Sequence, residues 1–283
     1  MANLIVPEVY AGIVSAKFKG KVKVANLAQD LGFLKNTTVG DTVTFPKWKA
    51  ITDAEEMTKG KALVPVNLEQ TSSQAKIKQI GKAIRVYDID DITAFGSAID
   101  EGANQQGKVF ARKLDADLIA EALTSPLKVA VGSEKALNAN DINSGLAMFG
   151  DEMDTEDMAG IVINSLLVNS LWSMPEFVDK NKTYNADGNG IVRNGMIGYF
   201  RNIPVYVADH GTYDSVKNEC VSLIIKKGAL AYMTKRDINI ELGRVPLEKA
   251  TDVVGDFIYA TKLVNDEGVV VLRKTVADGS KEK

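Results

Sequence analysis

The most informative part of the chain is TVTFPKWKAITDAEEMTKGKALVPVNLEQ, residues 42–70. It predicts two strands around a polar, glycine-containing turn, after which the chain stays extended through AKIKQIGKAIRVYDID. Pro46 and Pro65 interrupt the two strands, which favours a sheet edge over a buried sheet of the chain's own core. An arm of about a dozen residues at ~3.3 Å each reaches roughly 40 Å. Isolated hairpins are marginal in water, so another surface must support this one.

The overall composition is that of an ordinary folded protein. The chain has 283 residues, of which 45% are hydrophobic and 25% charged. Its net charge of −3 argues against a dedicated nucleic-acid-binding protein. A single cysteine, Cys220, excludes a disulfide framework and a thiolate metal cage. The start, MANLIVPEVYAG, has no basic segment typical of a signal peptide, and no apolar run is long enough for a membrane span. We expect a soluble, intracellular product.

A stripe of lysines marks the N-terminal region. The segment KFKGKVKV places Lys17, Lys19, Lys21 and Lys23 on one side of an extended chain, because strand side chains alternate. This stripe is either a solvated strand face or a contact with nucleic acid or an acidic neighbour. We expect residues 1–36 to form an arm without a core of its own.

A long helix is predicted from residue 99 to residue 123. Phe110, Leu114 and Leu118 recur at i, i+4 and i+8, the spacing of one apolar helix stripe. The Ser125-Pro126 pair ends this helix, which would extend roughly 37 Å. We expect the stripe to face a sheet made by the C-terminal strands.

Helices and strands alternate from about residue 139 to residue 225. NANDINSGLAMFGDEM and NSLLVNSLWSMPEF predict capped helices, AGIVIN a buried strand, and MIGYFRNIPVYVAD two strands about a tight bend. CVSLIIKKGALAYMTK predicts a strand followed by a short helix. The segments DINIELGRV, VVGDFIYATKLV and GVVVLRK predict further strands, and TVADGSKEK a polar end.

The residue types that commonly act in catalysis do not form a known catalytic motif in this sequence. His210 is the sole histidine and follows a predicted strand, where a surface turn explains it. Cys220 begins a buried strand and is expected to act as a small hydrophobe. Asp88 and Asp90 resemble a carboxylate pair, but a following helix explains them as N-terminal charges. We expect no enzyme activity and no cofactor.

One loop imitates part of a calcium site. Asn185, Asp187, Asn189 and Gly190 occupy positions 1, 3, 5 and 6 of such a loop, whereas Met196 stands where the bidentate carboxylate belongs. A surface loop therefore explains this segment better than a metal, and we expect no metal site.

The order of elements resembles the major capsid proteins of tailed double-stranded DNA bacteriophages, with the Hong Kong 97-type shell fold. The resemblance covers residues 39–274. GMIGYFRNIPVYVAD is similar to the family's glycine, strand, turn and strand element, and LIIKKGALAYMTKRDINIEL and DFIYATKLVNDEGVVVL look like its C-terminal helix and strands.

The resemblance implies an α+β fold with four named parts. These are an N-terminal arm (1–36), a hairpin called the E-loop (37–86), a peripheral P-domain with a long spine helix (87–138) and an α/β axial A-domain (about 139–235). Residues 236–283 would complete the P- and A-domains and end in a polar tail. The spine-helix core would be Phe110, Leu114 and Leu118.

The resemblance also implies self-assembly into hexamers and pentamers of an icosahedral shell around double-stranded DNA. The E-loop would lie on a neighbouring subunit and contact it through Phe45, Trp48 and Pro65. Lys17, Lys19, Lys21 and Lys23 would contact DNA weakly and without sequence preference. Scaffolding, portal and decoration proteins would be separate partners, assembly would occur in the host cytoplasm, and the product would be a virion capsid without a membrane.

Two alternatives stay open from the sequence. An encapsulin-type nanocompartment is similar in fold but encloses cargo enzymes. A soluble metal-dependent enzyme would use Asp88, Asp90 or the NADGNG loop. Particle size separates a multi-megadalton shell from a small enzyme oligomer.

Overall fold

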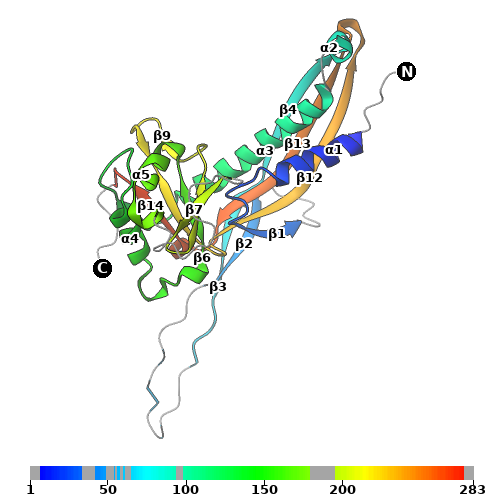
Figure 1. Cartoon of the computed structure of the whole chain (residues 1–283). Helices are drawn as coiled ribbons and strands as arrows, with labels where there is room; N and C mark the ends of the chain where they lie inside the picture. The colour runs from blue at the N-terminus through cyan, green and yellow to red at the C-terminus, as the bar shows by residue number, and fades with distance from the viewer. Residues whose placement is uncertain are drawn as a thin grey trace.

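The computed structural model describes residues 7–33, 42–48, 54, 56–57, 60, 65–93, 98–178 and 195–276. Figure 1 shows two parts that lie side by side. In the elongated part, long strands run beside two helices. In the rounder part, shorter strands and helices alternate. A mixed helix-and-strand fold is therefore confirmed.

A four-stranded sheet in the order β1, β12, β13, β4 forms the elongated part. Its strands are β1 (Gln29–Phe33), β12 (Leu230–Val245), β13 (Ala250–Leu263) and β4 (Lys78–Tyr87). β12, β13 and β4 are successively antiparallel, whereas β1 runs parallel to β12. The predicted strands DINIELGRV and VVGDFIYATKLV are confirmed as parts of β12 and β13.

The predicted long helix is confirmed as α3 (Ala98–Ala122), which runs along this sheet. Phe110, Leu114 and Leu118 are buried in one core with residues of β12 and β13. The close contact depends on Gly255 of β13, where an added Cβ would lie 3.3 Å from the Phe110 ring. The helical period of α3 and a missing side chain in β13 together let the ring lie on the sheet. A short helix, α2 (Asp88–Thr93), follows β4.

The N-terminal region is not the extended, coreless arm that its lysines predicted. Residues Pro7–Lys19 form helix α1, which packs against α3. Tyr10 and Val14 are buried, and Phe18 meets the Phe257 ring edge-on at 5.4 Å. These three side chains have the spacing i, i+4 and i+8, a helical signal that outweighs the alternating lysines of residues 17–23. The predicted strand face is therefore wrong.

A six-stranded sheet in the order β5, β14, β11, β6, β8, β7 forms the rounder part. The strands are β5 (Lys128–Ala130), β14 (Val269–Arg273), β11 (Ser222–Lys226), β6 (Met158–Ile163), β8 (Ile203–Val207) and β7 (Met196–Phe200). The helices are α4 (Ala139–Ala147), α5 (Val168–Trp172) and α6 (Pro175–Val178), with 3-10 turns η1 (Gly150–Glu152), η2 (Thr155–Asp157), η3 (Ser165–Leu167) and η5 (Asp266–Gly268).

The helices of the rounder part bury its second core. Ile142, Leu146, Leu171 and Phe177 pack with the sheet residues Ile161, Ile224 and Leu272. The predicted cap of α4 is confirmed, because the backbone N–H of Asn138 donates to the Asp141 carboxylate at 3.0 Å across the first turn. The second predicted helix is divided into three short pieces, η3, α5 and α6, and Pro175 is the first residue of α6.

Two further expectations are wrong. The segment GALAYMTK starts strand β12 rather than a helix, because β1 and β13 supply hydrogen-bonding partners on both of its edges. In the hairpin, β2 (Thr42–Trp48) pairs with β3 (Gln70–Lys76), whereas the described residues 65–69 form no strand. The second strand therefore begins later than its apolar residues predicted.

Candidate subunit interface

The base of the hairpin belongs to the subunit's own core. Val43 and Phe45 of β2 and Ala75 of β3 form a small apolar cluster with Ala231 of β12 and Ala260 of β13. Phe45 has an exposed fraction of 0%, which leaves it no surface for a second subunit. The expectation that Phe45 contacts another subunit rather than its own is therefore wrong. Alternation along β2 turns this ring inward beside Val43.

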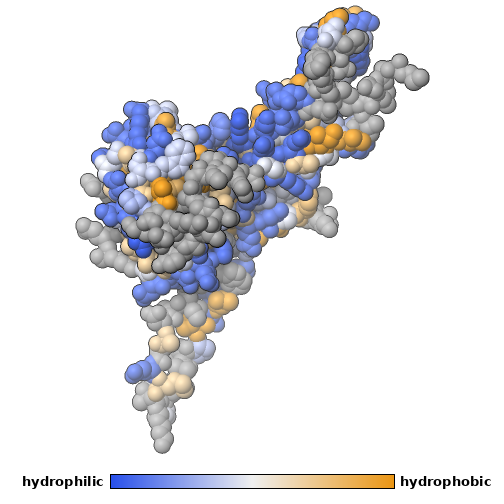
Figure 2. Space-filling view, in the orientation of Figure 1, coloured by the Kyte–Doolittle hydropathy of each residue, from blue (hydrophilic) through white to orange (hydrophobic). Residues whose placement is uncertain are grey.

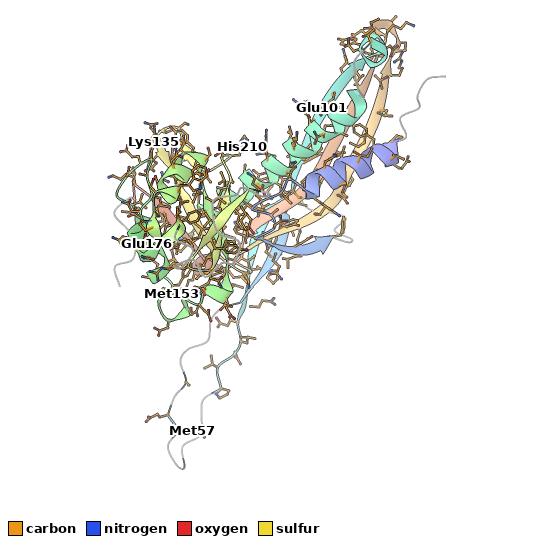
Figure 3. The ribbon with its side chains drawn as sticks, in the orientation of Figure 1. Met57, Glu101, Lys135, Met153, Glu176 and His210 are labelled. Carbon is orange, nitrogen blue, oxygen red and sulfur yellow. The ribbon has the colours of Figure 1, made fainter. Side chains whose placement is uncertain are left out.

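The outer part of the hairpin projects away from both sheets. Figure 3 shows Met57 near the far end of this segment, distant from the rest of the chain. Its described apolar side chains are exposed: Met57 by 75%, Val66 by 64% and Leu68 by 65%. Pro65 is exposed as well. Trp48 ends β2, opposite Gln70, and its side chain lies outside the described residues.

A second exposed apolar group lies at the far end of the elongated part. Leu247 is 98% exposed on the turn η4 (Pro246–Glu248), and Ile89 of α2 is 66% exposed. Figure 2 shows hydrophobic residues both here and on the projecting hairpin. Apolar side chains grouped on protruding segments are typical of surfaces that pack against another protein. The two ends of the subunit are therefore the candidate contact sites.

Ion pairs hold the end of the elongated part together. Arg244 of β12 donates two hydrogen bonds of 2.6 Å to the Asp88 carboxylate, and these bonds lower the pKa of Asp88. Arg85 of β4 similarly binds Asp252 of β13. These groups are exposed, so each pair contributes little to stability. The bidentate contact explains Asp88 as a partner of arginine rather than one of two catalytic carboxylates.

No candidate metal centre emerges from the described part of the chain. Within those residues, no three His, Cys, Asp or Glu side chains come close enough to share an ion. The NADGNG loop, with Asn185, Asp187, Asn189 and Gly190, lies outside the described residues. Similarly, no helix among those described is long and apolar enough to cross a membrane.

Asp115 joins the N-terminal segment to the middle of α3. Its two carboxylate oxygens accept hydrogen bonds of 2.9 Å from the backbone N–H groups of Lys23 and Ala25. Burial raises the pKa of Asp115 to about 6, and the backbone hydrogen bonds only partly oppose this effect. The segment after α1 is thereby fixed against α3, more than 80 residues away in sequence.

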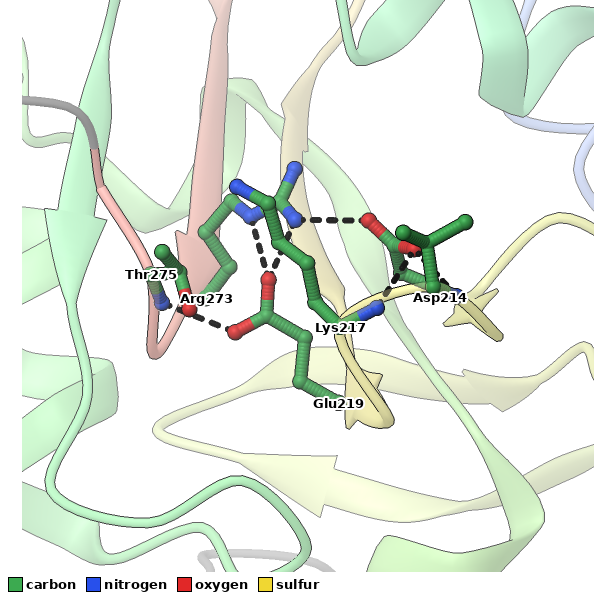
Figure 4. Close-up of polar contacts among 6 residues, drawn as sticks. Asp214, Lys217, Glu219, Arg273 and Thr275 are labelled. Carbon is green, nitrogen blue, oxygen red and sulfur yellow. Dashed lines mark hydrogen bonds and ion pairs between the residues drawn. The ribbon is translucent and has the colours of Figure 1, made fainter.

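A second buried carboxylate anchors the hairpin of β9 (Tyr213–Asp214) and β10 (Glu219–Cys220) to the C-terminal strand. Arg273 of β14 donates hydrogen bonds to Glu219 and, at 2.9 Å, to Asp214 (Figure 4). The backbone N–H of Thr275 binds the other Glu219 oxygen at 2.8 Å. Burial alone would raise the pKa of Glu219, but the bonds from Arg273 and Thr275 outweigh it and lower that pKa. The cluster is fully paired and structural.

The remaining candidate residues lie as follows. His210 is exposed on the turn after β8, and Cys220 is buried in β10. Lys17 and Lys19 occupy the last turn of α1, whereas Lys21 and Lys23 lie in the segment that follows it. Lys23 donates from Nζ to the carbonyl oxygen of Val207 at 2.6 Å, which draws this lysine toward β8 and away from a common stripe.

Sequence reasoning missed Lys108 and Arg112 of α3. These residues lie one helical turn apart and share a pocket with Lys21 and Lys23. Their i, i+4 spacing was readable in the sequence, but their proximity to the N-terminal lysines depends on the packing of α1 on α3.

Comparison with known proteins identifies the family. A family model described as phage capsid protein matches residues 70–272, most of the chain. A major capsid protein of Staphylococcus phage phiMR11 is 27% identical over 277 residues, which cover 96% of this chain and 94% of that protein.

Solved structures agree with this fold. A chain from Mycobacterium phage Che8 superposes with a TM-score of 0.65 at 17% identity, covering 90% of this chain and 92% of that one. The capsid of an empty GTA particle also gives 0.65, at 12% identity, covering 90% of each chain. These matches do not favour the encapsulin-type or enzyme alternatives. The chain therefore belongs to the phage capsid protein family, whose members form the shell of the virus particle.

Proposed function

We propose that this chain has the Hong Kong 97-type shell fold and assembles with copies of itself into the hexamers and pentamers of an icosahedral capsid. One observation carries the proposal: the hairpin beyond β2 and β3 projects from the subunit with Met57, Val66 and Leu68 exposed. An exposed two-stranded arm gains little from its own subunit. Burial of these side chains on a neighbour supplies the missing stabilisation.

We assign the parts of the fold accordingly. The hairpin within residues 37–86 acts as the E-loop, with Trp48 and Pro65 near the contact and Phe45 kept within its own subunit. The four-stranded sheet with α3 acts as the P-domain and the six-stranded sheet as the A-domain. Leu247 and Ile89, at the far end of the P-domain, supply a second contact between subunits.

The shell encloses double-stranded DNA and acts as a passive container. A net charge of −3 supports this role, because a strongly basic surface would add affinity with every phosphate it neutralised. Weak contact with DNA is assigned to Lys17, Lys19, Lys21 and Lys23. Scaffolding, portal and decoration proteins are separate partners, and assembly takes place in the host cytoplasm.

Deletion of residues 52–61 tests the hairpin's role. The shortened subunit should fold, because the β2–β3 ladder and the Phe45 cluster lie outside the deletion. Its urea unfolding midpoint should match that of the full chain. Electron microscopy and size-exclusion chromatography should show unassembled subunits instead of closed particles. Normal particles from this deletion would contradict the proposed function of the hairpin.

Replacement of Val66 and Leu68 by serine provides a finer test that preserves the length of the hairpin. Both side chains are exposed in the subunit, so its free energy of unfolding should change by less than about 0.5 kcal/mol per substitution. Particle yield should fall, because the neighbour loses apolar contacts. An unchanged particle yield would mean that these side chains stay exposed to solvent in the particle and do not contact a neighbouring subunit.

A further inference from the structure

A pocket of about 260 Å³ opens where the segment after α1, the middle of α3 and the turn after β8 meet. Its basic wall consists of Lys21, Lys23, Lys108 and Arg112. Figure 3 shows His210, which also lines it, at the junction between α3 and the rounder part. The pocket has room for a group several times the ~30 Å³ of a water molecule.

The cations of this pocket form no close ion pairs within the described part of the chain. Hydrogen bonds from Gln105 and Asn104 lower the pKa of Glu101 of α3, and the charges of Lys108 and Lys17 lie near enough to Glu101 to add to this effect. Among the residues that the structure describes, Lys21, Lys108 and Arg112 have no carboxylate within the 4.0 Å of an ion pair. Lys108 and Arg112 lie one turn apart on α3 and therefore point from the same helix face. The Lys23 ammonium group donates one hydrogen bond to the Val207 carbonyl oxygen, which leaves two N–H donors for a ligand.

The two acidic residues of the pocket offset only part of this positive charge, and Asp115 lies close enough to Lys23 for the two charges to interact. Both oxygens of Asp115 accept from the backbone of the N-terminal segment. Asp209 accepts from the backbone N–H of Ser165 at 2.8 Å. Four cations thus face two carboxylates whose hydrogen bonds are already directed to backbone groups, which leaves a positive surplus in a chain that is acidic as a whole.

The basic surface continues past the pocket. An added Cβ at Gly107 of α3 would lie 3.0 Å from the Cβ of Lys17, so Lys17 rests on α3 next to Lys108. The row contains more cations than a single small anion can contact. It therefore suits a polymer whose negative charges repeat at regular intervals. Duplex DNA carries one negative charge per ~1.7 Å of helix axis, and an arginine fork matches a phosphate in two hydrogen bonds.

We propose that this pocket binds a backbone phosphate of the enclosed DNA and that its side of α3 faces the interior of the shell. The inference rests on the proposed function, since it requires that the shell enclose DNA. Arg112 and Lys108 contact the phosphate from α3, and Lys21 contacts it from the segment after α1. These side chains contact the phosphate charge and not the edges of the bases, so the contact has no sequence preference.

A salt titration of DNA binding tests the pocket. Unassembled subunits are titrated into a fluorescent 30-base-pair duplex, and anisotropy is recorded at several salt concentrations. The double variant Lys21→Gln/Arg112→Gln should bind on the order of 10-fold or more weakly at low salt, and its salt slope should fall by about 2. Both positions are exposed, so the fold should persist.

The double variant Lys135→Gln/Lys217→Gln is the matched control. Both lysines are exposed on the rounder part and do not line the pocket, and the change in net charge is identical. The control should retain the wild-type slope, and Arg112→Lys should bind more tightly than Arg112→Gln. Equal losses in the pocket and control variants, or no loss in the pocket variant, would overturn the proposal.

Particle formation separates this proposal from its alternatives. The pocket variant should form shells of normal size by electron microscopy. A variant that binds DNA like the wild type but forms no shells would overturn the proposal and assign the pocket to an acidic segment of a neighbouring subunit. Because the titration uses unassembled subunits, it measures DNA binding by the pocket independently of shell assembly. Failure of the wild-type chain to form shells would contradict the proposed function and the interior position of the pocket, whereas the titration would still show whether the pocket binds a phosphate.

Discussion

The carboxyl group of Asp115 should make the stability of the subunit depend on pH in a specific window. Its pKa is about 6 in the folded chain, against an ordinary value of 3.8. The folded state therefore holds the proton more tightly than the unfolded state. The stabilisation due to this proton is complete below about pH 4 and is lost as the pH rises through 6. The difference between the two pKa values corresponds to a contribution of ~3 kcal/mol to the free energy of unfolding.

The Asp115→Asn variant isolates this contribution, because its side chain carries no titrating proton. Between pH 7 and pH 4, the wild-type free energy of unfolding should gain roughly 2–3 kcal/mol relative to that of the variant. At pH 7 the variant loses one carboxylate hydrogen bond but escapes the cost of burying a charge, so the two proteins should have similar stability.

Urea unfolding of unassembled subunits at half-unit pH steps measures the effect. Other carboxylates titrate equally in both proteins, so the difference between the two profiles reports Asp115. The exposed Asp151→Asn variant controls for the change in net charge. Parallel profiles for the wild type and the Asp115→Asn variant would mean that Asp115 titrates alike in the folded and unfolded states, which contradicts a raised pKa in the folded chain.

Three further outcomes are expected from unfolding titrations of unassembled subunits. Leu114→Ala should lower the free energy of unfolding by roughly 2–5 kcal/mol, since it opens a cavity between α3 and β13; an unchanged midpoint would mean that the helix face is wrong. Glu219→Gln should cost about 3 kcal/mol at pH 7 by weakening the pairing of Arg273. That loss should shrink as the pH falls below the ordinary glutamate pKa and through the lowered pKa of folded Glu219, because the wild-type carboxylate then takes up a proton; a pH-independent loss would contradict the charge argument. Gly12→Ala should add roughly 0.5–1 kcal/mol, because Gly12 lies inside α1 with no atom within 4 Å of an added Cβ; destabilisation would indicate a missed contact.

Local patterns in the sequence were sufficient for the long helix and most strands. The stripe of Phe110, Leu114 and Leu118 has the helical period over more than two turns, and few other structures bury such a stripe. The strands β6, β8 and β14 are short apolar or alternating runs with clear ends. Their order along the chain was enough to suggest the capsid family.

The tertiary structure decided the elements whose local signals conflicted. Alternating lysines favoured a strand at residues 17–23, yet Tyr10, Val14 and Phe18 bury one helix face against α3 and β13. Segment 229–235 has residues that suit a helix, yet β1 and β13 pair with it on both edges. In each case the burial or hydrogen bonds gained from distant segments exceed the few tenths of a kcal/mol per residue that propensity supplies.

The amino-acid sequence shows which segments are amphipathic, which residues are charged and in what order the elements follow. The internal position of Phe45, and the pocket that Lys21 and Arg112 both line, follow instead from the packing of distant segments. The physical reason is that periodicity states which side chains share a face but carries no information on which distant face covers them. That choice depends on packing, as at Gly255 and Gly107, where the absence of a side chain lets α3 approach β13 and α1.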